Sequence, residues 1–142
     1  MSAADNEALV RRWIQAYNDR DTAGEEAVRT ADFAAHIPGL PSFDNAGWKQ
    51  FVWGFAAAFP DLHLIVEDVV AAEDKVAARI RFRGTHRGEF MGIPATGREV
   101  TFASMEFNRV GGGRVAEHWV LIDMLGLLQQ LGAAPAPRGP AA

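Results

Sequence analysis

The sequence contains no cysteine, no long apolar run and no excess of positive charge. Without cysteine, disulfides, thiolate metal sites and cysteine nucleophiles are excluded, and a cytoplasmic setting is favoured. The longest apolar run, near Phe55, is far shorter than the ~20 residues that a membrane helix needs, and the polar, acidic N-terminus is unlike a signal peptide. The net charge of -4 gives no general attraction to nucleic acid or to an anionic membrane. We therefore expect a protein in solution that binds neither.

What is present is typical of one globular domain. The chain has 142 residues, 49% of them hydrophobic and 23% charged, which is close to the average for soluble domains. A domain of this size buries roughly two-thirds of the surface of its unfolded chain, so a core with a pocket is feasible. We place the domain in residues 1–132. The remaining segment, 133–142, has too few packing residues to order, and we expect a flexible tail.

The first half of the chain predicts helices. Apolar residues at helical spacing predict three of them, over 5–20, 21–31 and 45–59. Asp5 is the expected N-cap of the first helix, and either Asp44 or Asn45 caps the third, which Pro60 stops. A short extended piece, 33–37, lies between the second and third helices.

From Asp61 onward the apolar residues tend to recur at every second position, which is the spacing of β-strands. Four strands are predicted, over 61–74, 75–90, 98–110 and 114–123. Strands that follow a run of helices predict an α+β domain with the helices on one face of a mostly antiparallel sheet. Arg79, Arg81 and Arg83 share the outer face of this sheet, where we expect solvent or a second subunit to meet them.

The last strand runs directly into a short leucine-rich helix, with Asp123 at the junction. Strand alternation puts Asp123 on one face with Trp119 and Leu121. A carboxylate beside apolar side chains at a strand end gains basicity through desolvation, which makes Asp123 a candidate acid or base. An aspartate immediately before a helix is also a common N-cap. Both interpretations stay open at this point.

Other residues are candidates for contact with a small ligand. Tyr17 closes the apolar stripe of the first helix, with its hydroxyl either aimed into a pocket or at the rim. Trp53 lies off the main stripe of the third helix and either borders a cavity or packs in a second face of the core. The complete set of expected substrate-binding residues is Tyr17, His36, Trp53, His86, Met105, Phe107 and Trp119. Because the four histidines show no helix-spaced pair, we expect no metal site.

Three stretches taken together resemble a known family: FPDLHLIVEDVV, GTHRGEFMGIPATGREVTF and RVAEHWVLIDMLGLLQQLG. They resemble the SnoaL-like polyketide cyclases, also called ester cyclases, of the nuclear-transport-factor-2-like superfamily. The resemblance covers nearly the whole chain and departs at Ala95, where the loop commonly carries a second proline. It implies a cone-shaped α+β barrel, in which a curved, mostly antiparallel sheet and the N-terminal helices enclose one apolar pocket. It also implies a homo-oligomer, either a dimer or a tetramer, and no metal or organic cofactor.

The resemblance further implies an enzyme of antibiotic biosynthesis that closes a ring by intramolecular aldol condensation. Its substrate would be a small apolar or aromatic polyketide. The acid/base aspartate of the family maps onto Asp123, and Tyr17 falls at a position that contributes to the pocket. One rival hypothesis is an isomerase or epoxide hydrolase that uses the same Asp123. Another is a non-catalytic pocket protein, in which Asp123 only caps the following helix.

Overall fold

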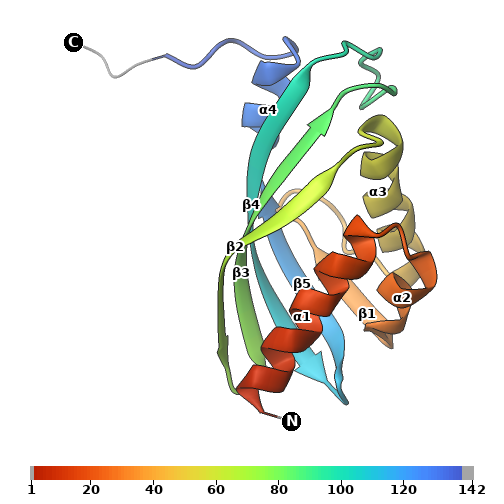
Figure 1. The fold of residues 1–142 in the computed structure, drawn as a ribbon, viewed down its shortest axis with the longest axis vertical. Coiled ribbons are helices and arrows are strands. Elements are labelled where there is room, and N and C mark those ends of the chain that lie inside the picture. The colour runs from red at the N-terminus through yellow and green to blue at the C-terminus, as the bar shows by residue number, and fades with distance from the viewer. Residues whose placement is uncertain (1, 139–142) are drawn as a thin grey trace.

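The computed structural model describes residues 2–138, which form an α+β fold on one curved five-stranded sheet (Figure 1). The helices are α1 (Ala3–Asn18), α2 (Thr22–Ala27), α3 (Asn45–Ala58) and α4 (Met124–Gln130), and the strands are β1 (Arg29–His36), β2 (His63–Ala72), β3 (Lys75–Thr85), β4 (Glu99–Gly111) and β5 (Arg114–Ile122). The predicted fold class is confirmed. None of the helices in residues 2–138 has the length and hydropathy to cross a membrane.

The strand order in the sheet is β1-β5-β4-β3-β2. Strands β2 to β5 pair antiparallel, whereas β1 runs parallel to β5 at the edge. The expected second helix was too long, because α2 ends at Ala27 and residues 29–31 belong to β1. The carbonyl of Val28 accepts the N–H of Val115 on β5, so pairing with the sheet competes with continuation of the helix here. The short extended piece is thus a full strand.

Side-chain caps explain where the helices begin. Ser2, not Asp5, is the N-cap of α1: its hydroxyl accepts the N–H of Asp5 at 3.1 Å, while the Asp5 carboxylate accepts the N–H of Ser2 at 3.0 Å. This reciprocal pair is a capping box, with Asp5 at its third helical position. Asp44 is the N-cap of α3 and accepts the N–H of Gly47 at 2.8 Å.

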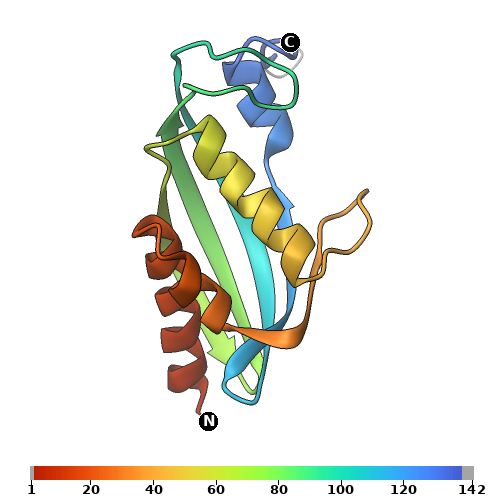
Figure 2. The ribbon, with the colours of Figure 1, turned by 90° about the vertical axis from the view of Figure 1, so that its right-hand side faces the viewer.

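Helices α1 and α3 cover one face of the sheet (Figure 2), and the side view shows the opposite face open (Figure 1). In β4, every second side chain from Val100 to Val110 is buried against these helices. The alternate residues of β4 point outward, and Met105 and Phe107 are 64% and 60% exposed. The covered face is called the inner face below, and the open one the outer face.

Two loops connect strands β3, β4 and β5. The β4–β5 hairpin turns at Gly112 and Gly113, which adopt φ angles of 58° and 77° that favour glycine. The longer β3–β4 loop spans residues 86–98 and is pinned by a bridge between Phe90 and Ile93. Residues 131–138 contain no helix or strand, and the rest of the expected tail, 139–142, lies outside the described residues.

Candidate active site

An apolar cavity lies between helices α1 and α3 and the inner face of the sheet. Aromatic side chains of the two helices form much of its wall: Trp13, Tyr17, Trp48, Phe51 and Phe55. The cavity has a volume of about 70 Å³, which is room for roughly two water molecules. Its walls suit a flat, largely apolar ligand that carries a few polar groups.

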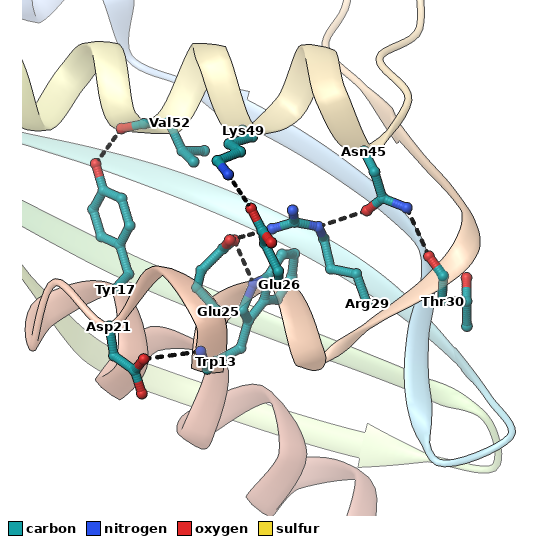
Figure 3. Close-up of polar contacts among 11 residues, drawn as sticks. Trp13, Tyr17, Asp21, Glu25, Glu26, Arg29, Thr30, Asn45, Lys49 and Val52 are labelled. Atoms are coloured by element: carbon teal, nitrogen blue, oxygen red, sulfur yellow. Dashed lines mark hydrogen bonds and ion pairs between the residues drawn. The ribbon is translucent and has the colours of Figure 1, made fainter.

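Several polar groups in the wall are already bonded within the protein (Figure 3). The Tyr17 hydroxyl donates to the Val52 carbonyl and joins α1 to α3. Trp13 Nε1 donates to Glu25 Oε1 at 2.8 Å, and the other oxygen of Glu25 pairs with Arg29. These bonds fix the positions of the helices over the sheet, so none of these groups is free for chemistry.

Besides Glu25, which is paired with Arg29, Glu106 is a buried carboxyl in the cavity wall. It lies on the inner face of β4, is 6% exposed and contributes to the cavity wall. Burial raises the pKa of the Glu106 carboxyl to about 7, although a hydrogen bond from Asn108 Nδ2 to Glu106 Oε1, at 3.1 Å, favours the ionised form. Near neutral pH this carboxyl therefore exists in both protonation states.

His118 on β5 lies beside Glu106, and Asn108 orients it. The Asn108 amide nitrogen donates to Glu106, so its oxygen is the acceptor for His118 Nδ1–H at 2.6 Å. This assignment leaves a lone pair on His118 Nε2, which lies 4.0 Å from Glu106 Oε2. Burial lowers the pKa of His118 to about 3, so its ring is neutral at physiological pH. A proton shared by the two side chains therefore resides on Glu106.

Together these groups can move one proton in a dry environment. A carboxyl with a pKa near 7 can remove a proton from an acidic carbon and return it to an oxygen, and enzymes tune catalytic carboxyls into this range by burial. The neutral imidazole next to it can accept a hydrogen bond from the protonated carboxyl. Within residues 2–138, no group of His, Asp and Glu side chains is arranged to hold a metal ion.

Asp123 lies outside this cavity. Strand β5 ends at Ile122, whose side chain lines the wall, and the next residue is the exposed N-cap of α4. The Asp123 carboxylate accepts the N–H of Gly126 at 2.9 Å. Asp123 therefore does not line this apolar cavity, and its contacts are those of the helix cap that the sequence also allowed.

Of the expected substrate-binding residues, Tyr17 lines the cavity. Trp53 packs behind Tyr17, with ring centroids 4.8 Å apart, and is not in the wall. His86 is fully buried in the β3–β4 loop, where its Nδ1 accepts the N–H of Thr96 at 3.2 Å. A residue on the inner side of the molecule thus need not reach the cavity.

The other expected residues lie on the outer face and do not line this cavity. The His36 ring stacks on Trp119 with centroids 5.6 Å apart, and His36 Nε2 lies 2.7 Å from Glu117 Oε2. Met105 and Phe107 are exposed beside them on β4. The large apolar side chains of β4 and β5 suggested a pocket wall, but the helices cover the opposite face.

The sequence carried a signal for the residues that were missed. Ser104, Glu106 and Asn108 alternate in phase with Val100 and Phe102, which places these polar side chains on the same face as apolar core residues. Polar residues in core phase are the unusual observation in a strand, since buried polar groups need partners or a function.

Comparisons with known proteins identify the family of the chain. The family model described as SnoaL-like polyketide cyclase matches residues 7–131. Aklanonic acid methyl ester cyclase DnrD of Streptomyces peucetius is 30% identical over 139 residues, which cover 92% of this chain and 94% of that protein.

Solved structures extend this similarity. AclR of Streptomyces galilaeus, a proposed hydroxylase, is 36% identical with a TM-score of 0.88, over 94% of this chain and 100% of that chain. IdmH of Streptomyces antibioticus, a proposed polyketide cyclase, is 35% identical with a TM-score of 0.79, over 89% of this chain and 98% of that chain. The chain belongs to the SnoaL-like polyketide cyclase family.

Proposed function

We propose that this protein is a polyketide cyclase that closes a ring by intramolecular aldol addition, with Glu106 as the acid/base group. The observation that carries the proposal is the buried Glu106 carboxyl in an aromatic-lined cavity, with its pKa raised to about 7. The relatedness to an aklanonic acid methyl ester cyclase supports a polyketide ester as substrate. Asp123 acts as the cap of α4 in this proposal.

The reaction uses a single proton. Ionised Glu106 removes a proton from a carbon that lies between two carbonyl groups, which leaves an enolate and a protonated carboxyl. The enolate carbon then forms a bond to a ketone carbon of the same molecule, and the electron pair of that carbonyl moves onto its oxygen. Protonated Glu106 finally returns the proton to this alkoxide. The product is an isomer of the substrate, so the atoms and electrons balance without a co-reactant.

His118 is a positioning residue in this scheme. Its Nε2 lies 4.0 Å from Glu106 Oε2, which is beyond hydrogen-bond distance, and would accept a hydrogen bond once the protonated carboxyl moves closer. Asn108 holds the other ring nitrogen of His118. The aromatic walls hold the substrate in a folded conformation in which the enolate carbon lies next to the ketone carbon. Bringing the two reacting carbons together accounts for a large part of the activation barrier of a ring closure.

The pH dependence of turnover tests this proposal. With aklanonic acid methyl ester as substrate, kcat/KM is expected to rise with pH to a plateau, with its midpoint near the Glu106 pKa of about 7, because the base must be ionised. An exposed aspartate with a pKa of about 4 would give a flat profile from about pH 5 upward.

Mass spectrometry of the product identifies the reaction in the same assay. Aldol closure leaves the substrate mass unchanged. A gain of one oxygen atom would indicate a hydroxylase, and a gain of one water would indicate hydration or epoxide opening. Either gain, or a flat pH profile, contradicts the proposed mechanism.

We also propose that the outer face of the sheet is a contact between identical subunits. Met105 pairs with Leu121 across β4 and β5, and Phe107 pairs with Trp119, so four apolar side chains form one patch. Arg79 borders this patch on β3. Exposed apolar patches on a sheet are typical of protein–protein contacts.

Light scattering of the dilute protein is expected to give the mass of a dimer or tetramer. The double variant Phe107→Glu/Leu121→Glu is expected to give the mass of a monomer. The reason is that it would bury four carboxylates facing each other across a two-fold contact. Leu40→Glu, at an exposed apolar residue in the loop before α3, is the control and should not change the mass. A monomer mass for the parent protein would contradict the proposal.

A further inference from the structure

Two polar groups in the cavity wall have no hydrogen-bond partner within residues 2–138: Ser104 Oγ and Trp48 Nε1. Both side chains are buried. A buried donor or acceptor without a partner lowers the stability of the folded protein by about as much as a lost hydrogen bond. Native proteins therefore rarely contain such groups unless the groups have a function. Trp13 and Tyr17, in the same wall, each donate to a protein acceptor. Both atoms are themselves covered by neighbouring protein atoms, so a ligand in the cavity would reach them by displacing a neighbouring side chain.

These two groups flank Glu106. Ser104 precedes Glu106 by two residues on the same face of β4, which separates them by about 7 Å along the strand. In the opposite direction along the sheet, His118 pairs with Asn108. The Trp48 ring packs against the His118 ring there, with centroids 5.0 Å apart. The two unpaired groups thus lie on opposite sides of Glu106 along the sheet, one at Ser104 and the other beside His118.

We propose that Ser104 and Trp48 bind the two oxygens of a planar 1,3-dicarbonyl group whose central carbon faces Glu106. The inference rests on the function proposed above. When Glu106 removes a proton from the central carbon, negative charge spreads over both oxygens. Two donors fixed beside those oxygens therefore stabilise the enolate more than the neutral ligand, which is the condition for catalysis. Ser104 and Trp48 would select substrates with a carbonyl on each side of the acidic carbon.

Binding of a small enolate tests this assignment separately from turnover. The test uses the full-length Glu106→Gln protein, whose neutral side chain neither repels an anion nor catalyses the reaction. The probe is 1,3-cyclohexanedione, which at pH 8 is an enolate that shares one negative charge between two oxygens. Cyclohexanone, with the same ring size and one neutral carbonyl, is the reference ligand. Affinities are measured by NMR titration.

In this background, adding Ser104→Ala or Trp48→Phe is expected to weaken binding of the diketone enolate by about tenfold each, as for the loss of one hydrogen bond to a charged acceptor. Binding of cyclohexanone should change less than twofold. Trp53→Phe is the matched control: Trp53 Nε1 is also buried and unpaired, but Trp53 is not in the cavity wall, so its loss should affect neither ligand.

Three results would each overturn the assignment. The first is an equal loss of affinity for both ligands, and the second is an effect of Trp53→Phe as large as that of Trp48→Phe. The third is that the enolate does not bind at all. These outcomes concern the two donors alone. Failure of the parent protein to cyclise its substrate would overturn the proposed function instead, whatever the titrations give.

Discussion

Replacing Glu106 by glutamine is expected to lower kcat for ring closure by about two orders of magnitude or more, the usual contribution of a positioned acid/base group. Glutamine keeps the size of the side chain and an oxygen for the Asn108 amide. Its own amide nitrogen can donate to the Nε2 lone pair of His118. The variant therefore lacks the base but keeps the local hydrogen bonds, and steady-state kinetics with saturating substrate measure the loss.

Melting temperatures show whether this loss reflects chemistry rather than unfolding. The pKa of Glu106 is raised from 4.5 to about 7 in the folded protein, so the folded state binds a proton that the unfolded state releases. The parent protein therefore loses the corresponding stability as the pH rises through this interval. Glu106→Gln lacks a titrating group and should melt at or above the parent temperature at pH 8.

Asp123→Asn is the matched control for the catalytic assignment. Asparagine caps a helix about as well as aspartate, so a cap role predicts parent-like melting and parent-like turnover. Full activity in Glu106→Gln together with a large loss in Asp123→Asn would reverse the assignment and make Asp123 the base.

The second large effect is expected on stability, at the buried ion pair of Arg29 and Glu25 (Figure 3). Arg29 also donates to Asn45 Oδ1 at 2.8 Å, so it joins α2 and β1 to α3. Arg29→Met leaves the Glu25 carboxylate buried with Trp13 as its remaining partner. Breaking a buried pair in this way lowers the free energy of unfolding by about 3–5 kcal/mol. Thermal unfolding followed by circular dichroism is expected to show a drop in Tm of roughly ten degrees.

Two further variants separate charge from packing in this prediction. Lys49→Met removes the exposed Lys49–Glu26 pair next to the network, and should change stability by less than about 1 kcal/mol. The double variant Arg29→Met/Glu25→Gln removes both buried charges and should recover part of the loss. Equal effects of Arg29→Met and Lys49→Met would contradict a special role for the buried pair.

Local patterns in the sequence were sufficient for the fold class and most elements. The spacing of apolar residues changes near Asp61 from that of helices to that of strands. The Asp44 cap and Pro60 mark the two ends of α3. Both signals depend only on residues a few positions apart, so they can be found in the sequence. The resemblance to the cyclases gave the family, which the family match confirms. The pairing of β1 with β5 joins segments about eighty residues apart and left no local trace.

The tertiary structure decided which face of the strands holds the site. Both faces of β5 are apolar enough to pack, with Val120 and Ile122 on one and Trp119 and Leu121 on the other, so alternation alone cannot tell inside from outside. A register shift after Arg109 also breaks the alternation, and Val115 is buried although it shares a phase with Trp119.

Helices α1 and α3 cover one face of the sheet and exclude solvent from Glu106 and His118. This burial shifts the pKa values of both side chains. Asp123, one residue beyond β5, stays in solvent and caps a helix. The sequence determined which carboxylates the chain has, and packing determined which one can act as a base near neutral pH, because desolvation depends on neighbours that are distant in the sequence.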